Sequence, residues 1–309
     1  MTGGLLYDAV LYSIIDLVLF DKPPPAVSKK FTLIIKNILH TSKTDLLLLI
    51  SIRSFKLEQI IHIHQKYKNN INRPVFSRAA AVAGDLNVIK YFIKNGVDFR
   101  QNNNDALSAA INNGHLHIVK YLMRECGAKI NEDNINLRKL IKNECNDMVI
   151  FLHQNGVNIS DELIECVFSN NIIIFKYVLK VYEYSKTFIS RTIAAAAYKM
   201  NDSFIYVIEE KISNFSECCD EGINEAASIN NYEMMEYLYN KRCGPPVEYK
   251  NGIYNACLMG YLDIVKFLHK RGTSITFNNN ICLSGAKNHK KRDIVKYLLK
   301  NGAQWPGKK

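Results

Sequence analysis

The sequence predicts an all-α fold: an array of stacked helix–turn–helix repeats with a helical cap at its N-terminus. Three observations predict it. An aromatic anchor recurs at a fixed spacing, apolar columns accompany it at helical offsets, and single glycines follow the expected helices. The chain has 309 residues, of which 48% are apolar and 22% are charged. That composition supplies a core and argues against a disordered chain.

The repeat is measured from one aromatic or branched apolar position in each unit. Successive anchors are 30 residues apart except for one gap of 26, which we attribute to a loop cut short between residues 156 and 162. Residues three and two before each anchor, and one after it, are apolar in all eight units, and these offsets form one face of a helix. The anchors are Tyr91, Tyr121, Phe151, Tyr177, Val207, Tyr237, Phe267 and Tyr297.

A second column, eleven residues before each anchor, predicts the first helix of each unit. Six of its eight members are alanine, and small side chains allow neighbouring units to approach closely. We therefore expect Ala110 and Ala226 in tight contacts between successive first helices. Glycines mark the helix ends, because glycine adopts left-handed backbone angles without steric cost. They are Gly84, Gly114 and Gly260 between the paired helices, and Gly96, Gly156 and Gly302 after the second helix.

These units resemble the ankyrin repeat. The segments 107–122 and 256–268 carry paired small residues followed by Gly-His-Leu-His-Ile-Val and Gly-Tyr-Leu-Asp-Ile-Val. The resemblance covers about residues 75–305 and implies an ankyrin-type solenoid. The period of 30 is shorter than the usual 33, and the Thr-Pro-Leu-His start is absent. Short, asparagine-rich units of this kind are similar to the ankyrin proteins that large DNA viruses of amoebae carry in many copies.

The expected organisation has three parts. Residues 1–72 form an N-terminal helical cap that includes a degenerate repeat at 45–53 and 57–64, residues 73–305 form eight repeats, and residues 306–309 form a basic tail. Terminal repeats of such arrays are atypical because one face packs while the other meets solvent.

The apolar run Leu5–Phe20 is about 16 residues long, which is shorter than a bilayer span requires. We expect it to be a buried helix ended by three prolines, and we expect no membrane association. The eight cysteines form no CxxC pair, which favours reduced thiols in an intracellular protein. The cytoplasm or nucleus is the expected compartment, in the host cell if the protein is viral.

No pattern of catalytic residues is present. Nucleophile elbows, phosphate-binding loops and paired metal-ligand motifs are all absent from the sequence. His62 and His64, like His115 and His117, are two residues apart, so on a helix they should point to different sides and hold no shared metal. We therefore predict a protein that is not an enzyme and that has no cofactor and no metal.

We expect the protein to be a monomer. The ankyrin resemblance implies that it binds another protein on a concave surface formed by loop tips and first helices. The residues that this implies as partner contacts are Phe99, Arg100, Asn131, Glu132 and Phe277. Exposed aromatic and arginine side chains often anchor interfaces. The competing interpretation is that Phe99 and Phe277 pack beneath the loops as core residues.

Two other functions remain open. The stretches 34–39 and 45–47 faintly resemble an F-box, which would recruit a ubiquitin ligase to a bound substrate. Charge suggests the other: residues 241–309 hold 14 Lys and Arg against 3 Asp and Glu, whereas residues 131–240 hold 9 against 17. The basic C-terminal end could contact phosphates. We do not expect nucleic acid as the partner, because no aromatic base-stacking motif accompanies the charge.

Overall fold

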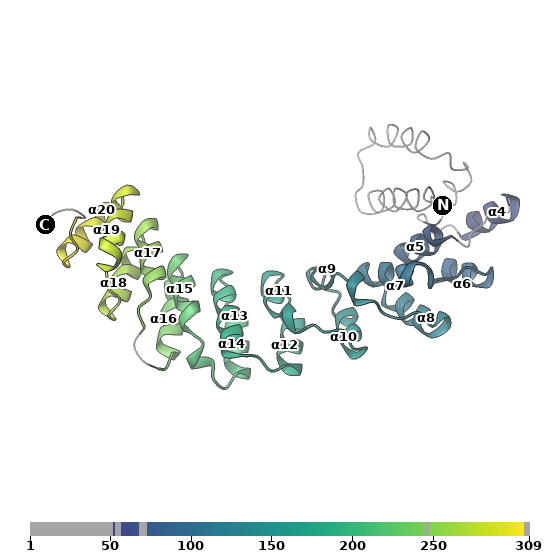
Figure 1. Cartoon of the computed structure of the whole chain (residues 1–309), viewed down its shortest axis with the longest axis horizontal. Coiled ribbons are helices and arrows are strands. Elements are labelled where there is room, and N and C mark those ends of the chain that lie inside the picture. Colours follow the sequence, from purple (N-terminus) through teal and green to yellow (C-terminus); the bar gives the residue numbers. More distant parts are fainter. Residues whose placement is uncertain (1–51, 53–56, 68–72, 245–246, 306–309) are drawn as a thin grey trace, which may run out of the picture. The chain divides into compact units, whose positions relative to one another are not determined.

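The computed structural model describes residues 52, 57–67, 73–244 and 247–305 (Figure 1). All regular secondary structure in these ranges is helical, which confirms the predicted all-α repeat fold. The chain divides into two compact units: Met1–Leu140 with Asp147–Val157, and Ile141–Asn146 with Asn158–Lys309. None of the described helices is both long enough and apolar enough to span a membrane.

After α4 (Leu57–Tyr67), the described helices alternate between the first and second helices of successive repeats. The first helices are α5 (Pro74–Ala83), α7 (Gln101–Asn112), α9 (Leu137–Lys142), α11 (Leu163–Phe168), α13 (Lys186–Tyr198), α15 (Asp220–Ser228), α17 (Lys250–Met259) and α19 (Phe277–Asn288). The second helices are α6 (Leu86–Lys94), α8 (Leu116–Cys126), α10 (Asn146–Gln154), α12 (Ile172–Val181), α14 (Asp202–Lys211), α16 (Tyr232–Lys241), α18 (Leu262–Lys270) and α20 (Arg292–Lys300). Three short 3-10 helices lie in the loops: η1 (Glu132–Asn134), η2 (Ser160–Glu162) and η3 (Phe215–Glu217).

First helices pack closely through small residues. In the first unit α5 contacts α7, and in the second unit α11, α13, α15, α17 and α19 pack in sequence order (Figure 1). Ala110 and Ala226 are fully buried, as predicted for the alanine column. Glycine extends this principle: a Cβ on Gly252 of α17 would lie 2.9 Å from the Cβ of Ala227 and 3.3 Å from the Cα of Asn224 on α15.

In every repeat, one residue between the two helices adopts left-handed backbone angles. Glycine occupies three of these positions, as the sequence predicted, and the other five hold larger residues with φ between 52° and 65°. Their spacing repeats that of the aromatic anchors, including the gap of 26. The residues are Gly84, Gly114, Glu144, Asn170, Met200, Asn230, Gly260 and Lys290.

Second helices are joined by the anchor tyrosines. The Tyr91 hydroxyl lies 2.7 Å from Nδ1 of His64 on α4, and the Tyr297 hydroxyl lies 2.8 Å from Nδ1 of His269 on α18. Each tyrosine buries its ring and keeps its hydroxyl bonded to the preceding helix, which is how a half-buried tyrosine satisfies its polar group. These two anchors therefore link successive second helices, with their rings half-buried between them.

Much of the predicted N-terminal cap lies outside the described residues. This holds for the run Leu5–Phe20, the F-box-like stretches and nearly all of the helix expected at 45–53. The second helix of the degenerate repeat is α4, and its Ile60 is fully buried, as is Ile52.

Candidate functional site

The first helices of the second unit present a face that none of the described helices covers. They stand side by side, and the second helices α12, α14, α16 and α18 lie along one side of the row (Figure 1). On α13 the opposite side carries Arg191, Ala194, Ala195 and Tyr198, which are exposed or half-buried. Their spacing of three to four residues defines one helix face. We call this surface, repeated along the row, the first-helix face.

Four large apolar side chains are exposed where these helices reach their turns. Phe168, Tyr198, Met200 and Met259 have 47–58% of their surface accessible. Phe168 and Tyr198 each lie two residues before the left-handed turn residue of their repeat. Ser228 occupies this position in the next repeat. Clusters of large exposed apolar residues on a folded protein mark interaction sites more often than scattered ones do. We call these four residues the turn-end patch.

Contacts between neighbouring turns fix the patch in place. The Lys199 ammonium lies 6.0 Å from the centroid of the Phe168 ring, so the turn of α13 reaches the end of α11. The Asn201 side-chain amide donates a hydrogen bond of 2.7 Å to Oδ1 of Asn170. These bonds run between residues about 31 positions apart, so the turns are held by their neighbours as well as by their own helices.

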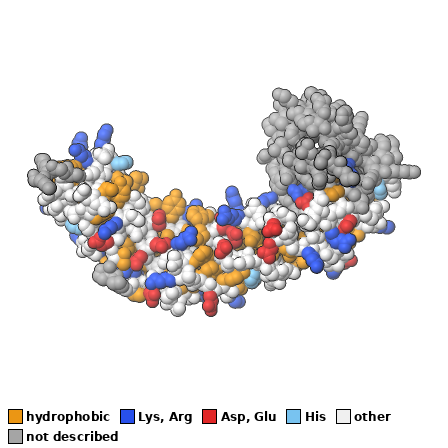
Figure 2. All heavy atoms as spheres, viewed as in Figure 1, with side chains coloured by type: hydrophobic (Ala, Val, Ile, Leu, Met, Phe, Trp, Pro, Cys, Tyr) orange, Lys and Arg blue, Asp and Glu red, His pale blue; other side chains and the backbone are white. Residues whose placement is uncertain are grey.

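Figure 2 shows hydrophobic side chains gathered along the edge of the second unit that the first helices form, with charged groups between them. The first-helix face of α15 carries Glu221, which is exposed, and Glu225, which is half-buried. The surface therefore offers apolar contacts next to carboxylates.

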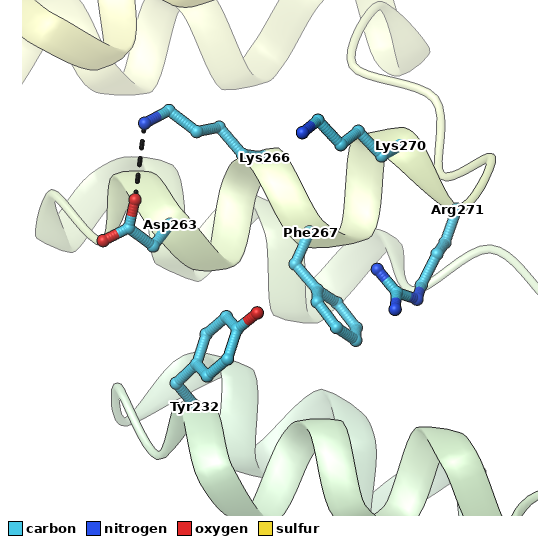
Figure 3. Close-up of a pocket in the computed structure, with 6 residues that line it drawn as sticks. All are labelled: Tyr232, Asp263, Lys266, Phe267, Lys270 and Arg271. Atoms are coloured by element: carbon cyan, nitrogen blue, oxygen red, sulfur yellow. Dashed lines mark hydrogen bonds and ion pairs between the residues drawn. The ribbon is translucent and has the colours of Figure 1, made fainter.

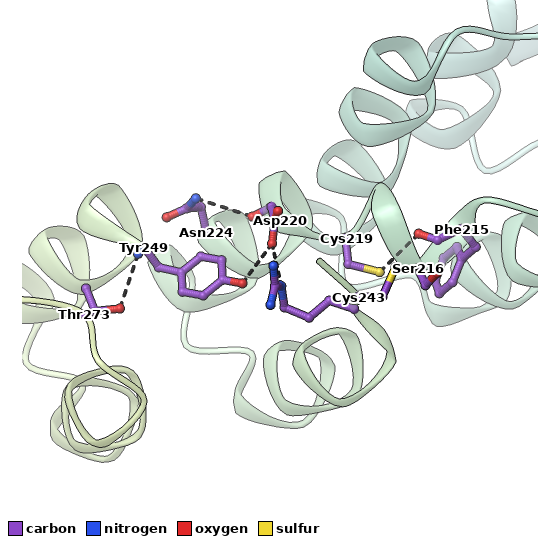
Figure 4. Close-up of polar contacts among 9 residues, drawn as sticks. Phe215, Ser216, Cys219, Asp220, Asn224, Cys243, Tyr249 and Thr273 are labelled. Carbon is purple, nitrogen blue, oxygen red and sulfur yellow. Dashed lines mark hydrogen bonds and ion pairs between the residues drawn. The ribbon is translucent and has the colours of Figure 1, made fainter. Parts of the chain in front are cut away.

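A polar network fixes α15 against the segment that follows α16 (Figure 4). The Asp220 carboxylate accepts hydrogen bonds from Nε of Arg242 at 2.9 Å and from the Tyr249 hydroxyl at 2.8 Å. The backbone N–H of Tyr249 donates to Oγ1 of Thr273. Burial, together with the hydrogen bond to Asp220, raises the pKa of Tyr249 far above its usual value. The tyrosine therefore keeps its proton, which it donates to the Asp220 carboxylate in the hydrogen bond that holds this segment to α15.

The structure corrects the expectation for Phe99. Its side chain is 1% exposed, so it offers no contact surface to a partner. Phe99 occupies the loop position that Ile159, Phe215 and Ile275 occupy in other repeats, and all four residues are buried. This position is the apolar core of the loop, as the competing interpretation held.

The other sequence-predicted contacts in the first unit lie in two separate loops. Arg100 is exposed and pairs with Asp98, with Nε 3.0 Å from Oδ1, and this hydrogen bond holds the pKa of Asp98 below its usual value. Asn131 begins η1, where its side chain accepts the backbone N–H of Asp133, and Glu132 is exposed. These three residues stay predictions.

Phe277 belongs to the second unit, where it begins α19. Its ring is half-buried, and the Lys250 ammonium lies 5.9 Å from the ring centroid. Phe277 is the repeat equivalent of Gln101 rather than of Phe99, which explains why the two phenylalanines differ in burial. Its role as a partner contact also stays a prediction.

The geometry of His115 and His117 corrects a second expectation. Their rings lie 6.3 Å apart, on the same turn, with Nε2 of His115 2.9 Å from the Val82 carbonyl and Nε2 of His117 3.3 Å from the Gly84 carbonyl. His115 precedes the helix, so the helical rule that separates residues two apart does not apply. Both histidines bind backbone carbonyls, and the described residues include no group of three or more potential metal ligands.

Sequence reasoning missed the turn-end patch. The position two residues before the turn is polar in four repeats and apolar in the other four: Val82, Phe168, Tyr198 and Leu258. Val82 is buried whereas Phe168 and Tyr198 are exposed, so the residue type in this column does not by itself indicate exposure.

Comparison with known proteins agrees with the helix pairs. A family model described as ankyrin repeats, in three copies, matches residues 48–134 and 76–163. An ankyrin repeat protein of Acanthamoeba polyphaga mimivirus is 31% identical over 106 residues, which cover 33% of this chain and 18% of that protein. A second ankyrin repeat protein of the same virus is 27% identical over 257 residues, which cover 80% of this chain and 59% of that protein.

The chain thus spans less than two thirds of the length of both relatives. The matched segments, the helix pairs and the turn residues in register with them agree on one family. Ankyrin repeats are therefore present over residues 48–163, and the described helix pairs continue the same pattern through residue 300.

Proposed function

We propose that this chain is a non-enzymatic scaffold that binds another protein on the first-helix face of its second unit, with the turn-end patch as the apolar contact. The observation that carries the proposal is the exposure of Phe168, Tyr198 and Met200 on two neighbouring turns that are bonded to each other, with Met259 exposed at the end of α17 in the same row of first helices. Interfaces concentrate their binding energy in a few aromatic and apolar anchors on a rigid surface.

The partner segment should combine apolar side chains with basic ones. Glu221 and Glu225 share the first-helix face with the patch, and neither forms an ion pair within the described part of the chain. Carboxylates of this kind favour a partner that brings lysine or arginine, mainly through faster and more selective association.

Both relatives are viral ankyrin repeat proteins, so we infer that the partner is a host or viral protein met inside an infected cell. Recruitment of a ubiquitin ligase through residues 1–72 stays a prediction that concerns residues outside the described ranges.

The test places a photoreactive amino acid at residue 198 of the full chain, in amoeba cells. The control places the same group at residue 206: Tyr206 is 51% exposed but belongs to the second helix α14. We expect a protein cross-linked from position 198 and not from position 206.

A double variant completes the test. Without the photoreactive group, that protein should co-purify with the full chain. Phe168→Ser with Tyr198→Ser should abolish this recovery, because the two substitutions remove two aromatic anchors from the surface without touching the buried columns. Equal cross-linking from both positions, or recovery that survives the double substitution, would refute the proposed surface.

A further inference from the structure

Arg271, just after α18, is stacked on aromatic rings on the second-helix side of the array (Figure 3). Figure 3 shows Arg271 beside Phe267, and its guanidinium carbon lies 3.5 Å from the centroid of that ring. The same carbon lies 4.9 Å from the centroid of the Tyr239 ring. Tyr232 of α16 meets Phe267 edge to face, with 5.5 Å between centroids. The Phe267 ring is 4% exposed, so Arg271 and the two tyrosines enclose it.

The cations beside this stack are poorly neutralised. A hollow of about 400 Å³ is lined by Tyr232, Asp263, Lys266, Phe267, Lys270 and Arg271. Asp263 is its one carboxylate, and it pairs with Lys266 at 3.3 Å. Among the described residues, no carboxylate lies within ion-pair distance of Lys270 or Arg271.

Lysines continue this basic surface onto the last repeat. Figure 3 shows Lys266 and Lys270 on the side of α18 away from Arg271. Lys296 and Lys300 occupy the same positions on α20, 30 residues later, and both are exposed. Helices α18 and α20 pack against each other, so the lysine pairs form neighbouring rows.

Stacking on the aromatic rings holds the Arg271 guanidinium in a conformation that can bind an anion. A guanidinium that lies flat on an aromatic ring keeps its N–H donors at its edges, and these match the two oxygens of a carboxylate. The rings also hold the side chain in one arrangement, so less conformational entropy is lost when it binds. An arginine of this kind, beside lysines of which Lys266 alone forms an ion pair among the described residues, is suited to an acidic ligand.

We propose that the surface formed by Arg271, Lys266, Lys270, Lys296 and Lys300 binds an extended acidic segment of a partner protein, with one carboxylate held by the Arg271 fork. This second surface lies on the second-helix side and is independent of the first-helix face. Charge complementarity supports the proposal, since residues 241–309 carry 14 Lys and Arg against 3 Asp and Glu.

An acidic peptide fits this surface better than a single-stranded nucleic acid does. Nucleic-acid binding of that kind requires bare aromatic faces on which bases stack. Here Arg271 itself lies over the rings of Phe267 and Tyr239, and Phe267 is 4% exposed.

The distance between neighbouring second helices determines how far apart the acidic residues of a probe peptide should be. Packed helices are about 8–10 Å apart, and a polyproline II segment places every third residue on one side at intervals of about 9 Å. Glutamates at every third position would therefore meet successive repeats. A suitable probe is a fluorescent nine-residue peptide of repeated Glu-Pro-Pro, with a Gln-Pro-Pro version as its neutral counterpart.

The experiment measures binding of both peptides to the full chain by fluorescence anisotropy. We expect the glutamate peptide to bind and the glutamine peptide to bind at least about tenfold more weakly. R271Q should weaken binding of the glutamate peptide by about tenfold or more, the loss expected for a charged hydrogen-bonded pair. The matched control is K180Q, because Lys180 holds the position of Lys270 on α12, three repeats away, and should change affinity less than about twofold.

Circular dichroism melts accompany each variant, and K270Q replaces R271Q if the latter does not fold. Unchanged affinity in the substituted protein, or an equal loss in K180Q, would show that the surface has no specific site. An eight-nucleotide single strand that binds more tightly than the glutamate peptide, and is lost in R271Q, would overturn the choice of partner in favour of nucleic acid.

Discussion

Gly84 shows how a single residue couples backbone conformation to packing between repeats. Its φ of 80° lies in the left-handed region, and a Cβ added there would lie 2.6 Å from the imidazole ring of His115. That ring bonds the Val82 carbonyl and therefore cannot move without losing a hydrogen bond. Glycine is required here for two separate reasons.

Gly96 has the left-handed backbone angle of Gly84 without the close contact to a neighbouring side chain. Its φ is 81°, but a Cβ there would meet nothing within 4 Å. We expect Gly96→Ala to lower the free energy of unfolding by about 1 kcal/mol, the cost of left-handed angles for alanine. Gly84→Ala should cost at least about 1 kcal/mol more, because the His115 hydrogen bond is strained or lost. Urea unfolding measures both, and equal losses would mean that the histidine contact contributes nothing.

At the scale of elements, the small residues of the alanine column allow neighbouring first helices to pack closely. Ala226 of α15 is fully buried, whereas Ala194 of α13 is half-buried on the first-helix face. The difference follows from helical periodicity, because residues on opposite sides of a first helix meet either the next helix or solvent.

We expect Ala226→Leu to destabilise the chain by about 1–3 kcal/mol, since a close-packed seam has no room for three more carbons. Ala194→Leu should change stability by less than about 0.5 kcal/mol, because its added surface reaches solvent. Thermal melts of the two variants provide the comparison. Similar melting temperatures would show that the two faces of the first helices have been assigned wrongly.

At the scale of the whole molecule, the described part of the array begins with buried contacts from residues that precede the clear repeats. Ile52 and Ile60 are fully buried, and His64 bonds Tyr91 of the first clear repeat. These contacts support the proposal that residues 1–72 act as a cap. Terminal caps of repeat arrays keep apolar faces away from solvent.

A chain shortened to residues 71–309 should melt more than about 5 °C below the full chain and aggregate on heating, because two buried isoleucines contribute about 1.5–3 kcal/mol each. Removal of residues 306–309 is the control and should leave the melting temperature unchanged. A shortened chain that is monomeric and equally stable would contradict the cap. If the full chain alone recovered ligase adaptors from host cells, residues 1–72 would have a recruiting function.

The sequence was sufficient to predict the repeat and its helix pairs. The period of 30, the single gap of 26, the buried alanine column and the glycine turns are all local periodicities, and each is present in the helices as described. Local patterns predict such a fold because each repeat contacts mainly its neighbours. Five of the eight turn residues went unrecognised, because Glu144, Met200 and Lys290 adopt left-handed angles without the glycine that usually indicates them, as do two asparagines.

Only the tertiary structure decided which side chains are exposed. Phe99 and Phe168 are the same residue type near the ends of elements, yet the first fills a loop core and the second is 47% exposed. The stacking of Arg271 on Tyr239 likewise joins residues that are 32 positions apart. Burial and charge pairing depend on which side chains of the neighbouring repeats lie opposite, about 30 residues away, and a local pattern carries no information about those contacts.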